Sequence, residues 1–374
     1  MTADASHEGQ HGGQRRLAPV RADVFLLAGQ FPGTSPGQAL ANTVTYALAA
    51  EQAGFTGAWI AEHHFGSYGS CPSALTLAGY LLGATTTLRI GTAACVLSSR
   101  HPVAVGEEAA LLTEVSGGRL DLGVARGGPW VDLEVFGTGL ARYATGFPES
   151  LDLLRAWLSG DREVSADGTH HRFRAVTVVP RPSRPVPLWV AATSAETAAL
   201  AAAARVPLLL GMHEGTRGTQ RLLDTYRAVA GQGCAPHARA HLAYVADRTD
   251  QARRALQAAM PAWLAAAGSS TRIDGTPGPA RDPDQYLQQL MAIHPVGDPG
   301  LCAERLSSAI AGTGVRHLLL LVEGAGDPAA TVENIRRLGA EVIPRLNCSG
   351  PAAAGGPAST GQHAASWSSG GPAA

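Results

Sequence analysis

Three short segments of the chain carry side chains that could take part in chemistry. EHHF at residues 62–65 offers two imidazoles, ARGG at 125–128 offers a guanidinium beside small residues, and ATSAET at 192–197 offers hydroxyls at the expected start of a helix. Each segment directly follows an apolar run that is typical of a buried strand. Imidazole can move a proton or bind a metal, whereas a guanidinium and a helix start both suit a phosphate. The spacing therefore predicts that proton chemistry and anion binding meet at the ends of strands.

The hydroxyl and arginine segments together predict an anionic cofactor. Free backbone N–H groups and hydroxyls at a helix N-terminus favour a phosphate, although Thr193 or Ser194 could simply cap the helix. Arg126 lies beside glycines that allow close backbone approach, and it is a natural phosphate partner unless it is only a surface residue at a turn. The predicted site lies after the fourth and fifth strands, not after strands seven and eight as in many barrels.

The adjacent histidines point to opposite sides if the strand continues through them. Only one of His63 and His64 would then face a pocket, and a structural hydrogen-bonding role is the ordinary alternative. A metal needs further ligands on the same side, and no HExxH motif or second cluster is present, so we expect no metal. Four other residues near strand ends are candidates for a substrate pocket: Glu62, Phe65, His101 and Ala125.

Eight apolar runs alternate with helical patterns, which predicts a single (β/α)8 TIM barrel better than an open sheet. No GxGxxG follows the first run, which disfavours an open dinucleotide-binding fold. The expected strands are Val24–Ala28, Gly57–Ala61, Arg89–Leu97, Leu120–Val124, Leu188–Ala191, Pro207–Gly211, His241–Ala246 and His317–Val322. The expected helices are Gly37–Ala53, Ser73–Gly83, Val103–Val115, Pro148–Leu158, Ser194–Ala204, Gly218–Gly231, Asp250–Ala266, Pro283–Ile293 and Ala329–Arg345.

Two stretches interrupt this alternation. Residues 161–187, after strand four, contain polar and Val-rich runs with prolines and predict an excursion with a small hairpin. Residues 268–282, after strand seven, are rich in Gly, Pro and Ser and predict a lid or a disordered loop. At the ends, residues 1–20 and 347–374 are predicted to be a disordered arm and a Gly/Ala/Ser-rich tail around a barrel at 21–346.

Composition limits the classes of partner. The 374 residues are 45% hydrophobic and 16% charged with a net charge of −1, so neither nucleic acid nor an anionic membrane is expected. The five cysteines form no CxxC pair, which disfavours a zinc site or a disulfide framework. No apolar run reaches the length of about 18 residues that a membrane span needs, and the polar N-terminus lacks a signal-peptide core. A cytoplasmic protein is expected.

Several motifs in order along the chain resemble the bacterial luciferase-like flavin-dependent monooxygenases, in particular the luciferase alpha subunit. The motifs are GFTGAWIAEHHF, GTAACVL, RHPV, SGGRLDLGVARG, VFG, VAATSAET and IHPVGDP. The resemblance implies an FMN-dependent two-component monooxygenase that takes reduced FMN from a separate flavin reductase. A role in natural-product metabolism is one expectation for such an enzyme. In such enzymes reduced FMN and O₂ form a C4a-hydroperoxide that oxygenates a small organic substrate. It also implies a homodimer formed through helices early in the barrel.

The resemblance also implies roles for individual residues. His63 matches the pocket histidine of the oxygen chemistry, with His64 beside it, and Ala93-Ala94 match a pair joined by a cis peptide that supports the flavin ring. Matches to the FMN phosphate site are Arg126, Ser194 and Thr197, with Thr193 and Ala195 in the same loop. Thr193 replaces an acidic residue of luciferase. Ala125 replaces its reactive cysteine, which argues against assuming light emission.

Two alternatives remain open at the level of the sequence. A deazaflavin (F420)-dependent oxidoreductase of the same superfamily would share the barrel and the phosphate site. A flavin-binding protein without catalysis would share the fold, but the known relative of this kind lacks part of the barrel. The sequence does not select a substrate among aldehydes, polyketides and small sulfur compounds.

Overall fold

Eight parallel strands close into a barrel in the computed structural model, which describes residues 19–231, 235–267, 271–277 and 281–348. Seven neighbouring pairs follow one another around the sheet, and the pairing of β3 with β5, Ile90 opposite Leu120, closes it. The predicted (β/α)8 fold is therefore confirmed. The barrel strands are β1 (Arg21–Leu26), β2 (Gly57–Ile60), β3 (Arg89–Thr92), β5 (Leu120–Ala125), β8 (Leu188–Ala192), β9 (Leu208–Leu210), β10 (Ala238–Leu242) and β13 (His317–Leu321).

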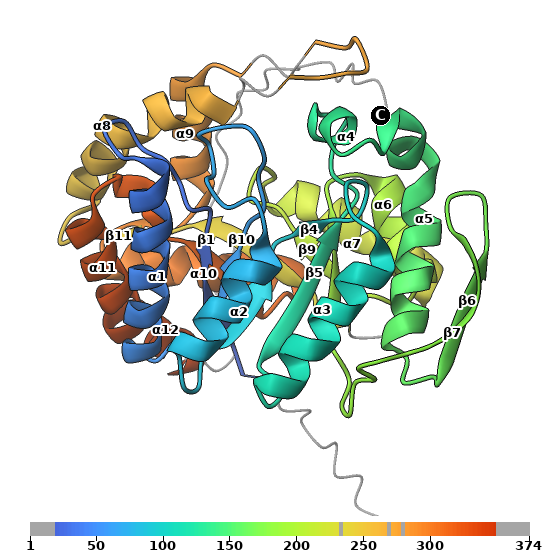
Figure 1. Ribbon diagram of the computed structural model, residues 1–374. Helices are drawn as coiled ribbons and strands as arrows, with labels where there is room; N and C mark the ends of the chain where they lie inside the picture. Colours follow the sequence, from blue (N-terminus) through green and yellow to red (C-terminus); the bar gives the residue numbers. More distant parts are fainter. Residues whose placement is uncertain (1–18, 232–234, 268–270, 278–280, 349–374) are drawn as a thin grey trace, which may run out of the picture.

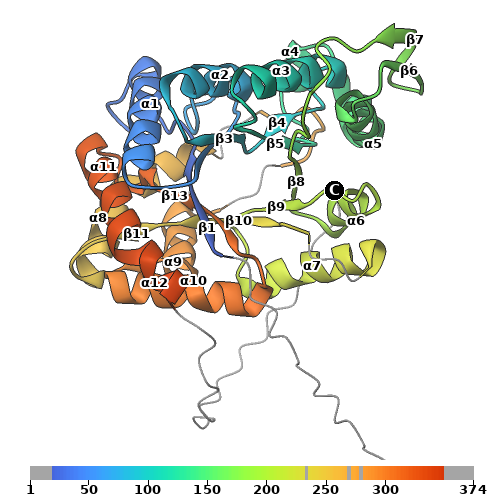
Figure 2. The same cartoon turned by 90° about the horizontal axis from the view of Figure 1, so that it is seen from below.

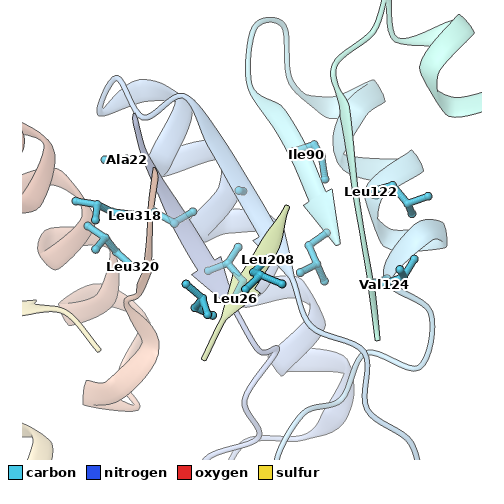
Figure 3. Close-up of a cluster of buried hydrophobic side chains, with 14 of the residues drawn as sticks. Ala22, Leu26, Ile90, Leu122, Val124, Leu208, Leu318 and Leu320 are labelled. Carbon is cyan, nitrogen blue, oxygen red and sulfur yellow. The ribbon is translucent and has the colours of Figure 1, made fainter. Parts of the chain in front are cut away.

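Alternate residues of each strand face opposite sides of the barrel wall. One set points outward and packs under the helices, as Leu26, Leu122 and Leu320 do in Figure 3. The other set fills the interior, where Trp59 and Trp189 meet edge to face at 5.2 Å between ring centroids. Because both faces are buried, the strands are mostly apolar, with buried polar residues such as Asp23 and Asp121 as exceptions.

Helices surround the barrel on its outer side (Figures 1 and 2). Several begin at side-chain caps, such as Ser35 before α1, where Ser35 and Gln38 form a reciprocal capping box. The helices are α1 (Pro36–Gln52), α2 (Ala74–Ala84), α3 (Pro102–Val115), α4 (Asp132–Val135), α5 (Gly139–Leu158), α6 (Ala195–Ala203), α7 (Thr216–Ala230), α8 (Thr249–Ala267), α9 (Pro283–Ile293), α10 (Pro299–Thr313), α11 (Pro328–Arg337) and α12 (Ile343–Cys348).

The structure differs from the predicted elements in a few places. The third strand is split into β3 and β4 (Cys95–Val96) by a cis peptide between Ala93 and Ala94. The seventh starts earlier than predicted, and a separate β11 (Tyr244–Val245) pairs with β12 (Val296–Gly297). The short α4 and the capped α10 were not predicted. Helix α5 starts at Gly139, earlier than the predicted start at Pro148, so that this proline lies inside the helix.

The excursion after the fourth barrel strand contains the expected hairpin. Strands β6 (Glu163–Asp167) and β7 (Arg172–Thr177) pair antiparallel and project beside α5 at the edge of the molecule (Figures 1 and 2).

The predicted terminal arms fall almost entirely outside the described residues, as do 268–270 and 278–280 of the predicted lid. Within the described part of the chain, no helix combines the length and apolarity needed to cross a membrane.

A buried ionic network holds the amino-terminal end of the barrel. Asp23 is fully buried and accepts hydrogen bonds from His317 Nε2 at 2.7 Å and from Trp59 Nε1 at 2.8 Å, and it lies 2.7 Å from the Arg21 guanidinium. Burial alone would raise the pKa of Asp23, but the His317 hydrogen bond and the Arg21 charge hold it well below its usual range. Arg21 also pairs with buried Asp121 at 2.6 Å. The network links four strands of the barrel, β1, β2, β5 and β13.

We predict that Asp23→Asn lowers the free energy of unfolding at pH 7 by about 3 kcal/mol, since it leaves the Arg21 charge partly unpaired in a buried site. A carboxyl with a depressed folded-state pKa stabilises the protein above its ordinary pKa, and this stabilisation is lost as the pH falls. The difference between variant and wild type should therefore shrink below about pH 4. Chemical denaturation at several pH values measures it, with the exposed Asp167→Asn as control. An equal loss in both variants would contradict the prediction.

Candidate active site

Three cavities lie at the carboxyl ends of the barrel strands, and His63 lines all of them. The inner cavity, about 200 Å³, lies at the barrel mouth between His63, Ala93 and Thr193. The side cavity, about 390 Å³, lies between the ends of β2, β4 and β5. The outer cavity, about 300 Å³, extends toward α8 and α9 and is bordered by Trp130 and Tyr286. The histidine predicted to be catalytic is therefore shared by all three.

The His63 ring has one buried nitrogen that forms no hydrogen bond with the described residues. Its Nδ1 atom is inaccessible to solvent and has no hydrogen-bond partner in the structure. Burial, assisted by the neighbouring His64, lowers the pKa of His63 to about 4, so the imidazole is neutral at neutral pH. The ring packs against Gly69, where a Cβ would lie 2.6 Å from Nδ1. A bound molecule could supply the hydrogen bond that the protein does not.

Two acidic residues border the side cavity in different ways. Glu62 accepts the backbone N–H groups of Ala74 and Val96, both at 3.1 Å, and so ties the end of β2 to α2 and β4. Asp132, which the sequence did not single out, is buried with Oδ1 unpaired, and burial raises its pKa despite the nearby His64. His64 Nε2 is likewise buried without a hydrogen-bond partner and lies 3.9 Å from Glu62 Oε1. The side cavity thus has unpaired polar atoms on two of its walls.

Small residues form the walls between the cavities. The cis peptide at Ala93-Ala94 matches the expectation from the family resemblance. Ala93 borders the inner and side cavities, while Ala94 and Ala125 border the side cavity. Side chains of this size leave room for a flat group to approach the backbone closely.

Arg126 and the start of α6 come together as the sequence predicted. Ser194 caps α6 by accepting the Thr197 N–H at 3.2 Å, and the Arg126 guanidinium lies 3.9 Å from Glu196 in the first turn. Arg126 also stacks on Tyr143 of α5, 4.9 Å from its ring centroid, a neighbour that the sequence did not reveal. A guanidinium beside hydroxyls and a helix N-terminus fits a phosphate. We call this group the phosphate cradle.

Of the remaining predicted site residues, three lie at or beside the cavities and one lies away from them. Thr193 lines the inner cavity, and Ala195 is the first residue of α6 next to the cradle. Phe65 lies at the rim of the side cavity against Phe136, with 6.0 Å between ring centroids. His101 instead caps α3 and packs on His171 of the excursion, so the structure does not bring it to the lining of the three cavities.

A polar pair that was not predicted from the sequence lies between the end of β9 and α9. His213 Nδ1 is hydrogen-bonded to the Tyr286 hydroxyl, and both side chains line the outer cavity. Behind them, buried His294 holds the Met212 carbonyl through Nε2 at 2.8 Å and contacts His241. These residues are separated by dozens of positions in the chain, so no local motif could have identified them.

Part of the predicted lid covers the side of the site. The Val131 N–H donates to the Thr271 carbonyl and the Ile273 N–H donates to the Pro129 carbonyl, each at 2.9 Å. Arg272 stacks on Trp130, 5.1 Å from the ring centroid. A role for residues 268–282 as a lid stays a prediction. Among the residues that the structure describes, no group of three or more His, Cys, Asp or Glu side chains is arranged to hold a metal ion.

A closed (β/α)8 barrel with cavities at the carboxyl ends of its strands is the architecture of a barrel enzyme. Residues 20–317 match the luciferase-like monooxygenase family. The chain therefore belongs to this family and is an oxidoreductase. It is 28% identical over 353 residues to the alkanal monooxygenase alpha chain of a Kryptophanaron alfredi symbiont, with 86% of this chain and 97% of the relative covered. The alpha chain of Photorhabdus luminescens is similar at 28% identity, with 86% of this chain and 96% of the relative covered.

Solved structures share the fold. A monooxygenase from Streptomyces bottropensis superposes with a TM-score of 0.75 at 23% identity, covering 87% of this chain and 99% of the other. The oxygenating constituent of 3,6-diketocamphane monooxygenase from Pseudomonas putida, in complex with FMN, gives 0.70 at 17%, covering 88% and 99%. An F420-dependent secondary alcohol dehydrogenase gives 0.65 at 18%, covering 88% and 99%. The shared fold thus accommodates both FMN and F420.

We predict that Gly69→Ala destabilises the protein by about 1–3 kcal/mol, the usual cost of overpacking a filled site. The new methyl group would meet both His63 Nδ1 and, at 2.7 Å, the Leu27 carbonyl oxygen. Gly83→Ala in α2 is the control, because nothing lies within 4 Å of its would-be Cβ and alanine favours a helix. Thermal unfolding compares the two variants. The close packing of His63 would be refuted by equal melting temperatures for wild type and Gly69→Ala.

Proposed function

We propose that this protein is the oxygenase component of an FMN-dependent two-component monooxygenase. A separate reductase would supply reduced FMN, and O₂ would be the second substrate, with one oxygen atom transferred to a small organic compound. The observation that carries the proposal is that His63 lines all three cavities, which lie at the same end of the barrel as the phosphate cradle.

The cradle would hold the FMN phosphate. Arg126 would provide a bidentate charge-assisted contact, and Ser194 with Thr197 would add hydroxyl and backbone donors at the start of α6. Glu196 is exposed and would move away from Arg126 when a phosphate replaces it. The small walls at Ala93 and Ala125 leave space for the ring system.

When bound, reduced FMN supplies the electrons that activate O₂. The protein's contribution is to position the reactants and to exclude water. His63 is neutral at neutral pH because of its lowered pKa, so it offers one N–H donor and one acceptor nitrogen, not an extra proton. It would hold the proton of the activated oxygen in place by a hydrogen bond from a buried, water-poor position. Ala125 stands where luciferase has a reactive cysteine, which argues against assuming light emission.

We predict that His63→Ala retains FMN binding within a few-fold and lowers oxygenated product by about 100-fold or more, a typical effect for a lost proton-handling group. The electrons from reduced FMN should then appear as hydrogen peroxide. The assay couples the protein to a flavin reductase and quantifies product and peroxide in parallel. His170→Ala, in the loop of the excursion hairpin, is the matched control. Product formation at the wild-type rate in His63→Ala would overturn the assignment of His63.

We also propose that the protein forms a homodimer through α2 and α3, which lie side by side on one face (Figures 1 and 2). Large apolar side chains are exposed there: Tyr80 is 63%, Leu111 51% and Val115 70% accessible. Exposed apolar clusters of this kind mark protein contacts.

We predict that Leu111→Glu reduces the solution mass measured by light scattering to that of one chain. Val229→Glu on α7, 50% exposed, should leave the mass unchanged; an unchanged mass for Leu111→Glu would contradict this interface.

A further inference from the structure

The outer cavity has an unusual balance of charge. The described residues that line it include one guanidinium, from Arg281, and no carboxylate. Among the residues that the structure describes, no carboxylate forms an ion pair with Arg281, whereas Arg272, beside the same loop, is paired with Asp274 at 2.7 Å. A cation at the wall of a partly enclosed cavity favours a negatively charged guest, because few competing charges are close.

Two further polar groups stand next to Arg281. The guanidinium carbon lies 5.0 Å from the centroid of the Tyr286 ring, and the Tyr286 hydroxyl is hydrogen-bonded to His213. Burial raises the pKa of Tyr286 to about 12, so its phenol stays protonated. Burial, together with the Arg281 charge, lowers the pKa of His213 to about 4, so its imidazole stays neutral. The group presents a positive charge and one free donor, either the Tyr286 O–H or the His213 Nε2–H, because the hydrogen bond between the two side chains uses the other proton. It carries no negative charge of its own.

The backbone that carries His213 is fixed from behind. His294 is completely buried and contacts the carbonyl of Met212, the preceding residue, at 2.8 Å. Arg305 in turn donates to the His294 carbonyl. The polar end of the cavity is therefore held by buried contacts before any ligand arrives, which reduces the entropy lost on binding.

The walls of the cavity are made mainly of rings. Tyr68 ends a stack in which its ring lies 4.7 Å from that of Trp263, which in turn lies 4.9 Å from Phe31. Trp130 faces the cavity from the loop after β5. Among the described lining residues, the aliphatic part consists of Leu264, Pro283 and three alanines of α8. Rings of this kind pack best against a flat, aromatic guest.

We infer that the outer cavity is the substrate site and that it selects an aromatic compound with an acidic oxygen, a carboxylate or a phenolate. The ring would lie between Tyr68 and Trp130, and the acidic oxygen would meet Arg281, Tyr286 and His213. The inference rests on the proposed function, because the substrate would then lie beside His63, which lines this cavity as well. An alkanal, as named for the alpha-chain relatives, has neither a ring nor a charge to use these groups.

The test uses equilibrium binding to the full-length protein without flavin, by isothermal titration calorimetry. The probes are 2-naphthoate, 2-naphthol, the uncharged 2-naphthamide, and decanoate as an acid without a ring. We expect 2-naphthoate to bind at least about tenfold more tightly than the amide and than decanoate, as charge-assisted hydrogen bonds imply. A preference for 2-naphthoate over 2-naphthol indicates a carboxylate, and the reverse indicates a phenolate.

Three variants locate the selectivity. Arg281→Met should abolish the preference for the acid over the amide, and Tyr286→Phe should weaken 2-naphthoate about tenfold. Arg254→Met removes an exposed arginine of α8 and should leave binding unchanged, which controls for net charge. Equal affinities for acid and amide, tighter binding of decanoate, or an equal loss in Arg254→Met would each overturn the inference.

The same preparations are titrated with reduced FMN, to which Arg281→Met should bind normally. If wild type binds 2-naphthoate selectively but does not bind reduced FMN, the proposed function fails while the ligand class stands. If it binds reduced FMN but shows no acid selectivity, only the present inference fails.

Discussion

The hydrogen-bonded closure between β3 and β5 is the constraint on which the site depends. It brings the end of β2, with His63, close to the end of β5, with Arg126, although the two residues are far apart in the chain. The end of the barrel opposite the cavities stabilises this closure through Asp23, Asp121 and the arginines that pair with them. An open sheet would separate the two segments and would leave no shared cavity.

The buried carboxylates and imidazoles at the two ends of the barrel differ in how they are hydrogen-bonded, although Arg21 Nε at the amino-terminal end also lacks a partner. At the amino-terminal end, Asp23 has hydrogen-bond donors on several sides, and its pKa is depressed accordingly. At the carboxyl end, three buried atoms have no hydrogen-bond partner among the described residues: His63 Nδ1, His64 Nε2 and Asp132 Oδ1. Since an unpaired buried polar atom costs free energy, such atoms mark places where a ligand is expected to complete the hydrogen bonding. Stability is thus concentrated at one end and binding capacity at the other.

Much of this arrangement could be predicted from the sequence, because apolar runs and caps are local signals. Ser194 and Arg126 were found from their positions at strand ends, and the fold then brought them together. The rest depends on contacts between distant segments. Asp132 belongs to a short helix with no clear pattern, and His213 meets Tyr286 only because β9 and α9 are neighbours at the rim. His101 also follows a strand, but its ring packs against the excursion, which no local pattern reveals.

The central claim is that a phosphate-bearing reduced flavin is held by Arg126 and the start of α6, within reach of His63. The most direct measurement is an anaerobic titration of wild type and Arg126→Met with reduced FMN, reduced riboflavin and reduced F420. We expect wild type to bind reduced FMN most tightly of the three flavins. Removing the phosphate, with reduced riboflavin, or the guanidinium, with Arg126→Met, should weaken binding about ten- to a hundredfold. Equal affinity for reduced riboflavin and reduced FMN, or tighter binding of reduced F420, would contradict it.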